Sequence, residues 1–352
     1  MATKRRKSAA AAAALDMQLG EVEYPREQEI ALSIAAVIED FVRRRDAEGP
    51  LRRDVHPKAH GCLKAKFRIN ADLPASLHTD IFQPAAVYDA WVRYSNSAPE
   101  PADDHRRDAR GMAIKLLGPD GERIRADADY PLAQDFILIN HPVFFINDPA
   151  DYLTFMRRTL SASLVDKALI PLALGVRGSA IVLATAAKPL LPLARTRFWS
   201  TVPYTWGKGA KRQAIKYSVR LLDDAAAIPP LGDGADALRD GLREILDKRA
   251  IVLDFAVQQR ASHAHSIEDV MTEWPEDEMP FQSVARLTIP RQRFDTSARD
   301  ARGEAMAFNP WHCSPSHRPL GAINRLRLTI YERIAALRRA GGKKRRRSRR
   351  PE

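Results

Sequence analysis

The chain has 352 residues, 45% of them hydrophobic, which is enough for one large domain or two ordinary ones with a sizeable core. Its net charge is +12, but KRRK near the N-terminus and KKRRRSRRPE at the C-terminus carry most of the excess, so the remaining chain is nearly neutral. The charge therefore argues against a basic nucleic-acid-binding domain. It predicts disordered tails at 1–20 and 341–352 around one domain at 21–340. The tails are available to nucleic acid or an anionic membrane, and a solvated tail without a role is at least as good an interpretation.

Two cysteines, Cys62 and Cys313, exclude a disulfide framework and suit a reducing compartment. The N-terminus is rich in alanine and lacks the leucine-rich core of a secretion signal, so we expect a cytoplasmic protein. The most apolar region, 168–194, is interrupted by Pro171, Arg177, Lys188 and Pro189. Its longest uncharged piece is shorter than the ~20 residues of a membrane-spanning helix. We expect either a buried helix pair or a hydrophobic lid on the surface.

The predicted elements begin with an amphipathic helix at 26–45, after which the hydrophobic period changes from that of a helix to that of a strand. Short strands are predicted at 64–71, 86–95, 112–118, 135–140, 214–222, 250–259 and 283–290. Further helices are predicted near 150–165, 236–249 and 321–340. Several strands alternate polar with apolar residues, which is typical of a sheet with one buried face. Seven such strands with turn-rich connections indicate an antiparallel sheet or barrel in an α+β fold.

The last predicted helix carries a tyrosine flanked by arginines at helical spacing. At 100° per residue its apolar side chains gather on one arc, with Tyr331 on the flank of that arc. Arg327 lies one turn before Tyr331, and Arg338 lies two turns after it. Taken alone, such a tyrosine is an ordinary boundary residue with its phenol in water.

Other candidate motifs are weak when each is taken separately. Two histidine pairs, in HPKAHG (56–61) and HCSPSH (312–317), lack a recognisable zinc-ligand spacing. The sequence contains no glycine-rich phosphate loop and no nucleophile elbow. A histidine-rich segment precedes the first strand, an Asn-His-Pro corner follows the fourth, and the tyrosine helix ends the domain.

Seven segments in a fixed order give these weak signals a common explanation. They are RDVHPKAHG (53–61), AWVRYSN (90–96), RDARGMAIKLLG (107–118), INHPVFFIND (139–148), EWPEDEMP (273–280), FNP (308–310) and RLTIY (327–331). Together, over roughly residues 50–340, they resemble the haem catalase family. The resemblance implies an antiparallel β-barrel of the catalase type with surrounding helices. It also implies bound haem b (ferric protoporphyrin IX).

The resemblance also implies a role for each matching residue. His56 stands for the distal catalytic histidine, with His60 as the competing assignment, and Asn140 stands for the distal asparagine. Tyr331 stands for the axial iron ligand, a role in which an anionic phenolate suits peroxide chemistry. The remaining cofactor-binding positions are Arg53, Arg93 and Arg338 at the propionates, Ser95 as a hydrogen-bond partner of the distal histidine, Val55 and Phe145 in the pocket wall, and Arg327 beside the phenolate.

The implied function is disproportionation of hydrogen peroxide to water and dioxygen, with peroxidase activity on organic donors and a role in oxidative stress. The chain is considerably shorter than a full catalase, so a homo-oligomer stays open while a wrapped, nicotinamide-binding tetramer is not expected. Met112 and His141 replace the family's usual residues beside the distal pocket. One alternative is a fatty-acid hydroperoxide peroxidase or isomerase of the allene oxide synthase type, against which Val55 argues, since those enzymes have threonine there. The other alternative is a non-enzymatic haem-binding protein.

Overall fold

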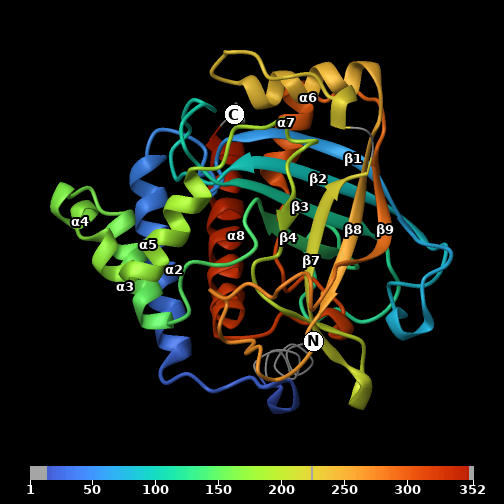
Figure 1. Cartoon of the computed structure of the whole chain (residues 1–352). Coiled ribbons are helices and arrows are strands. Elements are labelled where there is room, and N and C mark those ends of the chain that lie inside the picture. Colours follow the sequence, from blue (N-terminus) through green and yellow to red (C-terminus); the bar gives the residue numbers. More distant parts are fainter. Residues whose placement is uncertain (1–13, 223–224, 349–352) are drawn as a thin grey trace.

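The computed structural model describes residues 14–222 and 225–348, so the basic stretches at 4–7 and 349–352 lie outside the described residues. A nine-stranded antiparallel sheet forms the centre of the molecule (Figure 1). Its strands are β1 (Ala59–Ile69), β2 (Val87–Asn96), β3 (Arg110–Leu117), β4 (Gln134–Ile139), β5 (Phe198–Trp199), β6 (Tyr204–Trp206), β7 (Gln213–Leu221), β8 (Ile251–Gln259) and β9 (Gln282–Ile289). β5 pairs with both β4 and β7, which closes the sheet into a ring. The predicted antiparallel barrel is confirmed.

The interior of the barrel is filled by aromatic side chains. Phe136 lies at the middle of this cluster, with ring centroids 4.8 Å from Phe255, 5.0 Å from Tyr217 and 6.1 Å from Phe67. All four are almost fully buried. They come from four different strands because alternate residues of a strand point to the same face, which the alternating sequence pattern had indicated.

Helices cover the outside of the barrel. They are α2 (Glu27–Arg45), α3 (Pro149–Thr159), α4 (Leu164–Ala168), α5 (Ile170–Ala186), α6 (Ala237–Lys248), α7 (Ser297–Ala305) and α8 (Ala322–Ser348), with short 3-10 turns at Met17–Leu19, Ala75–Leu77, Gly209–Lys211, Ala225–Ala227 and Pro315–His317. α2 and α8 pack side by side against the barrel (Figure 1). The buried residues of α2 recur every three or four positions, from Ala31 to Val42.

Three elements were not predicted. β5 and β6 are only two and three residues long, too short for a periodic pattern. α7 has one buried residue, Gly303, and therefore shows no apolar stripe. Its N-terminal signal is Thr296, whose side chain accepts a hydrogen bond from the backbone N–H of Arg299.

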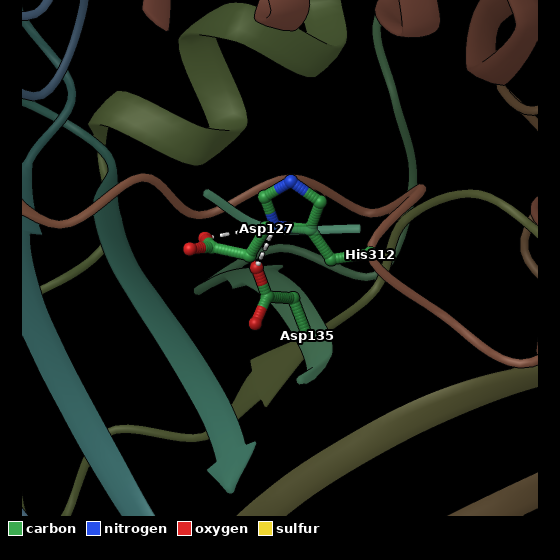
Figure 2. Close-up of side chains that lie close together, drawn as sticks. All are labelled: Asp127, Asp135 and His312. Carbon is green, nitrogen blue, oxygen red and sulfur yellow. Dashed lines mark hydrogen bonds and ion pairs between the residues drawn. The ribbon is translucent and has the colours of Figure 1, made fainter. Parts of the chain in front are cut away.

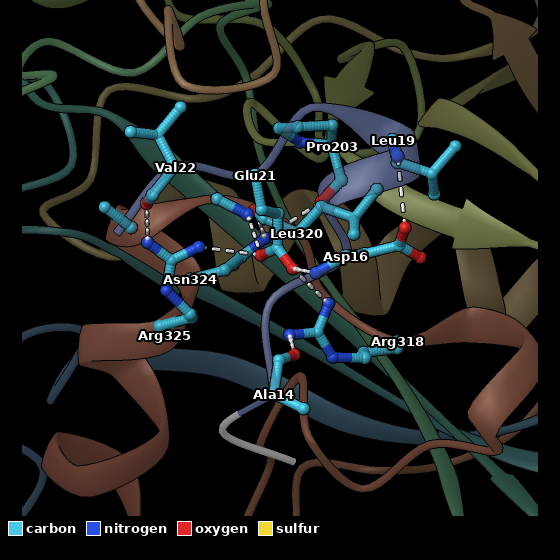
Figure 3. Close-up of polar contacts among 12 residues, drawn as sticks. Ala14, Asp16, Leu19, Glu21, Val22, Pro203, Arg318, Leu320, Asn324 and Arg325 are labelled. Carbon is cyan, nitrogen blue, oxygen red and sulfur yellow. Dashed lines mark hydrogen bonds and ion pairs between the residues drawn. The ribbon is translucent and has the colours of Figure 1, made fainter. Parts of the chain in front are cut away.

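The domain extends further into both predicted tails than the sequence indicated. Residues 14–20 are packed against the domain. Ala14 O accepts from Arg318 Nη2 at 2.7 Å (Figure 3). Asp16 forms an ion pair with Arg212 at 2.6 Å. At the other end, α8 continues to Ser348, beyond the predicted boundary at 340. The tail boundaries therefore shift because charged partners far along the chain, which composition cannot reveal, hold the N-terminal segment.

A buried charge network joins this N-terminal segment to the start of α8. Arg325 lies near the start of α8 and is only 7% exposed. Its guanidinium pairs with Glu21 at 2.7 Å, and Arg318 pairs with the other oxygen of Glu21 at 2.7 Å (Figure 3). Arg325 also pairs with Glu27 at 2.8 Å. Arg325 can be buried because two carboxylates neutralise it.

The apolar region after α3 forms α4 and α5. Of the two predicted arrangements, the buried helix pair is wrong, because side chains such as Leu172 and Val176 are 74% and 91% exposed. Gly175 takes non-helical angles (φ 63°, ψ −177°) and kinks α5. By length and composition alone, one helical stretch among the described residues, Leu164–Ala186, is long and apolar enough to cross a membrane.

Candidate active site

His56 lies on the loop between α2 and β1. Arg45, in the last turn of α2, donates from Nη2 to Arg53 O at 2.7 Å and from Nη1 to Asp54 O at 2.9 Å, which fixes the path of this loop. His56 itself has φ 61°, in the left-handed region that non-glycine residues rarely adopt. A strained backbone held by neighbouring contacts is typical of functional sites.

The imidazole of His56 packs against the ends of two neighbouring strands. Its Nδ1 lies 3.0 Å from Ser95 Oγ on β2, and Ser95 is paired in register with Gly111 on β3. A β-carbon at Gly111 would meet Cε1 of His56 at 2.6 Å and Nδ1 at 2.7 Å. The glycine of the RDARG segment therefore makes room for the histidine ring, which explains why that segment carries a glycine at this position.

The surroundings of His56 keep its imidazole neutral. Burial, together with the nearby guanidiniums of Arg93 and Arg53, lowers the pKa of His56 to about 3. Arg93 also donates from Nη2 to the backbone carbonyl of His56 at 2.8 Å. A neutral imidazole with one nitrogen engaged by Ser95 has its other nitrogen available to accept a proton.

Asn140 follows β4 directly and is held by the same strand β3. Its Oδ1 accepts from the backbone N–H of Arg110 at 2.8 Å, and its own N–H donates to Arg110 O at 3.0 Å. Within residues 14–222 and 225–348, no acceptor engages its Nδ2. Because Arg110 precedes Gly111, one short stretch of β3 positions both Asn140 and the His56 ring.

His60, the competing candidate for the distal base, lies inside β1 and is fully buried. Its Nε2 bonds with Asn96 Oδ1 at 2.7 Å, and its Nδ1 is 3.8 Å from Asp104. Asn96 also binds Arg110 through the same oxygen. His60 is therefore enclosed in a structural network, whereas His56 is only partly buried.

Three arginines from distant parts of the chain converge on one carboxylate. Glu304, near the end of α7, lies 3.0 Å from Arg53, 3.4 Å from Arg93 and 4.0 Å from Arg338. The side chains of these arginines are 12%, 4% and 11% exposed. We call these four residues the arginine cluster. It carries a net charge of +2 in a mostly buried place.

The arginine cluster is short of negative charge. Burial and the positive charge of Arg53 lower the pKa of both Arg93 and Arg338 to about 9. The Nε atoms of Arg93 and Arg338 are buried and have no hydrogen-bond partner among the described residues. Buried donors without acceptors are rare in folded proteins. A dianionic group with carboxylates, such as a haem with two propionates, fits this cluster.

Tyr331 lies on α8, one turn after Arg327 and partly buried against the core. Burial raises the pKa of its phenol, while Arg327 lowers it. The guanidinium of Arg327 therefore lowers the pKa of Tyr331 as expected, but by less than burial raises it. The phenol is protonated unless a bound cation displaces the proton. Arg327 also lowers the pKa of His56, so the charge of one guanidinium reaches both candidate residues.

An aromatic wall adjoins this region. The Cζ of Arg327 lies 5.2 Å from the ring centroid of Phe144, and the ring of Phe145 lies 4.4 Å from Phe144 and 4.9 Å from Phe155. Tyr152 is 5.7 Å from Phe144. We call Phe144, Phe145, Tyr152 and Phe155 the aromatic wall. A flat apolar ring system suits such a surface.

The remaining predicted positions are less informative. Val55 is partly buried beside His56 in sequence, with no specific contact to its side chain. Met112 is buried in the barrel wall. Burial and the neighbouring Lys188 lower the pKa of His141 to about 4, and its Nδ1 has no partner in the described part of the chain.

The lysine of the RDARGMAIK segment serves a different purpose. Lys115 donates to Asp135 at 2.8 Å and to Asp127 at 3.0 Å, and His312 Nδ1 lies 2.9 Å from Asp135 (Figure 2 shows the two aspartates and the histidine). Asp135 also accepts from the backbone N–H of Asn309 at 2.9 Å. This buried network ties β3 and β4 to the FNP segment and so positions the chain that leads into α8.

Sequence reasoning missed Glu304 and the specific use of Gly111. Glu304 lies on a helix without apolar periodicity and 251 residues from Arg53, so no local signal pointed to it. Gly111 was inside a quoted segment, but the contact that needs a glycine is with a loop residue far away in the sequence.

Comparisons with known proteins agree with this fold. Residues 28–163 match the family model described as catalase, and this range contains Arg53, His56, Arg93 and Asn140 but not Tyr331. A fungal catalase structure is similar with a TM-score of 0.64 and 18% identity, covering 83% of this chain and 60% of its own. Catalase A from Saccharomyces cerevisiae gives 0.63 and 17%, covering 83% and 62%.

A bacterial catalase gives a TM-score of 0.58 and 20% identity, covering 86% of this chain and 60% of its own. This chain therefore spans about three fifths of the length of the catalases it resembles. At these identities the structural likeness establishes the barrel with its surrounding helices. The match over residues 28–163 makes that part of the chain similar to the catalase family.

Proposed function

We propose that this protein is a haem-dependent hydroperoxidase that disproportionates hydrogen peroxide to water and dioxygen. The observation that carries the proposal is the arrangement around β3. A neutral imidazole at His56 and an Asn140 side chain whose Nδ2 is unengaged among the described residues are fixed by adjacent residues of one strand. A base and a hydrogen-bond donor held together in this way suit a small substrate with two bonded oxygens.

The proposed cofactor is haem b. Arg53, Arg93 and Arg338 would hold its propionates, and Tyr331 would ligate its iron as a phenolate. Phe145 and the rest of the aromatic wall would contact the ring. When bound, the haem supplies the two-electron redox chemistry that the side chains of this protein lack.

The protein's own contribution is to move a proton and to orient the substrate. With the proton on Nδ1 donated to Ser95 Oγ, the Nε2 of His56 would take a proton from one peroxide oxygen and give it to the other, which leaves as water. The two electrons consumed when the O–O bond breaks would come from the haem. Such acid–base help is worth ~10²–10⁴-fold in rate. The Nδ2 of Asn140 donates to the peroxide and stabilises the charge that develops on it.

A second candidate is turnover of fatty-acid hydroperoxides, either by reduction with an organic donor or by rearrangement. The aromatic wall and the exposed apolar surface of α5 favour it, because both suit a long acyl chain. It predicts fast loss of lipid hydroperoxide with little dioxygen released from hydrogen peroxide.

The test is to measure dioxygen release by the haem-loaded protein and by three variants, His56→Ala, Asn140→Ala and Tyr331→Phe. We expect a fall of ~10²-fold or more for His56→Ala and a smaller fall for Asn140→Ala. Tyr331→Phe is expected to bind haem with an altered iron absorption spectrum. Unchanged turnover in His56→Ala transfers the base role to His60, and an unchanged spectrum in Tyr331→Phe removes the axial ligand from the proposal.

A further inference from the structure

α4 and α5 carry the most exposed apolar surface among the described residues. We call residues 164–186 the apolar arm. Figure 1 shows it beside α3, with α4 at the outer edge of the molecule and away from the strands. Its most exposed apolar side chains are Leu164 (80%), Val165 (69%), Leu172 (74%), Val176 (91%) and Leu183 (67%). Only 6% of the most apolar window of this arm is buried. Apolar patches of this kind on soluble proteins mark interaction sites.

Positive charge surrounds the apolar arm. Between residues 149 and 195 the chain has six lysines and arginines but only two carboxylates, and it has no glutamate. Arg157 on α3 and Lys167 on α4 are exposed, and the side chain of Arg177, which pairs with Asp269, is 53% exposed. One of the two carboxylates, Asp166, is engaged by the hydroxyl of Ser161 at 2.5 Å.

The apolar arm cannot cross a bilayer as one straight helix. Gly175 breaks α5 near its middle, and each half is then shorter than the ~20 residues that a membrane helix needs. Arg177 follows the break by two residues and pairs with Asp269 at 3.7 Å. A kinked apolar arm that is tied to the domain fits a position in the plane of a membrane surface.

We propose that the apolar arm docks this protein on the surface of an anionic lipid bilayer. The exposed leucines and valines enter the boundary between head groups and acyl chains, and the flanking cations bind anionic head groups. A bilayer fits better than a second copy of this chain, because the cations that flank the arm would face their own like charges in a symmetric contact.

The arm adjoins the aromatic wall, which gives the docking a consequence for substrate choice. A β-carbon at Gly178 on α5 would meet the backbone oxygen of Phe145 at 2.7 Å, so α5 and the wall touch. A docked protein holds this wall close to the bilayer. If the proposed function holds, lipid hydroperoxides are the substrates within reach of the docked protein. Docking itself does not depend on haem.

The test uses an environment-sensitive fluorophore on the full-length chain. Cys62 and Cys313 are both free and buried, so a single labelling site can be introduced with Val176→Cys. We expect the emission to shift to the blue with vesicles of phosphatidylcholine containing about 30% phosphatidylglycerol, and at least about tenfold less binding to pure phosphatidylcholine. The label at Val87→Cys, on β2, is expected to keep its emission.

Sedimentation with the same vesicles separates the arm from the basic tails. Val176→Glu with Leu183→Glu is expected to lower binding about tenfold or more, while Val87→Glu with Leu222→Glu, which keeps both tails and the arm, leaves it unchanged. Binding that survives in the arm variant belongs to the tails and overturns the proposal. A dimer in solution that the arm variant dissociates, without vesicle binding by the unmodified chain, assigns the arm to self-association and also overturns it.

Discussion

The ring of His56 rests directly on the α-carbon of Gly111, at a distance that leaves no room for a methyl group. A β-carbon at Gly111 would lie 2.6 Å from the imidazole Cε1 and 3.1 Å from Ser95 Oγ. The glycine thus acts through the histidine. For the proposed function it is a positioning residue, because it touches the proposed base, His56, rather than the substrate.

Gly111→Ala is expected to displace the His56 ring and to lower peroxide turnover by ~10²-fold, since a misplacement of about 1 Å can cost that much. Haem binding is expected to stay close to that of the unmodified protein. Dioxygen release and haem titration measure the two effects. Gly49→Ala, where nothing lies within 4 Å of the new methyl group, is the matched control. Full turnover in Gly111→Ala contradicts the positioning role.

The low pKa of His56 predicts how activity and stability depend on pH. Because its pKa is lowered to about 3, the imidazole stays neutral from pH 8 down to about pH 4. Initial rates are therefore expected to show no fall near pH 6.5. Above about pH 6.5, His56 is neutral in both the folded and the unfolded protein, so its titration takes nothing from the free energy of unfolding. As the pH falls from about 6.5 towards 3, only the unfolded protein takes up a proton at His56. The free energy of unfolding therefore falls by up to about 1.4 kcal/mol per pH unit. Denaturant titrations over this range measure that loss, and its absence in His56→Gln tests the assignment.

Glu304→Gln removes the one carboxylate that the arginine cluster contains. Burial raises the pKa of Glu304, but the three arginines lower it by more, so the carboxylate is charged. Its side chain is 38% exposed, and solvent screening limits the expected loss to about 1 kcal/mol in the haem-free protein. In the haem-loaded protein the propionates supply negative charge, so the loss is expected to be smaller. Equal losses in the two states, measured by denaturation, contradict a propionate site at this cluster.

Arg327→Met is expected to raise the pKa of Tyr331 further, because burial then acts on the phenol without the opposing guanidinium. Forming a phenolate becomes harder, so haem affinity at neutral pH is expected to fall by ~10-fold and to recover as pH rises. Haem titrations between pH 7 and 9 measure this shift. Arg339→Met, at an exposed position on the same helix, is expected to leave the pH dependence unchanged.

Lys115→Met removes the ammonium group that pairs with Asp127 and Asp135 and leaves both buried with His312 and backbone N–H groups as partners. Removing one member of such a network is expected to cost about 3–5 kcal/mol of unfolding free energy. The two aspartates and the histidine have ligand atoms within 4.8 Å of one another, so Zn²⁺ is expected to restore part of the lost stability in this variant. In the unmodified protein the ammonium group of Lys115 already supplies positive charge to the two aspartates. Zn²⁺ is therefore expected to have no effect on the melting temperature of the unmodified protein.

The sequence by itself determined the barrel and most of its strands. Alternation of polar and apolar residues is a local property of a strand, so β2, β3, β4, β7, β8 and β9 were predicted within two residues of their observed bounds. β1 begins five residues before its predicted start and includes His60 and Gly61, which were predicted to precede it. The order of short motifs also identified His56, Asn140 and Tyr331 as one candidate set. The order of these motifs along the chain can be read from the sequence even where their residues lie far apart in space.

Tertiary structure alone decided the contacts between distant segments. Glu304 joins Arg53, Arg93 and Arg338 because α7, β2 and α8 meet there, and no periodicity records such a meeting. The exposure of the apolar arm was likewise undetermined, since hydropathy measures the composition of a helix and not its neighbours. Burial, charge pairing and the room beside Gly111 depend on packing between elements, which a single sequence does not specify.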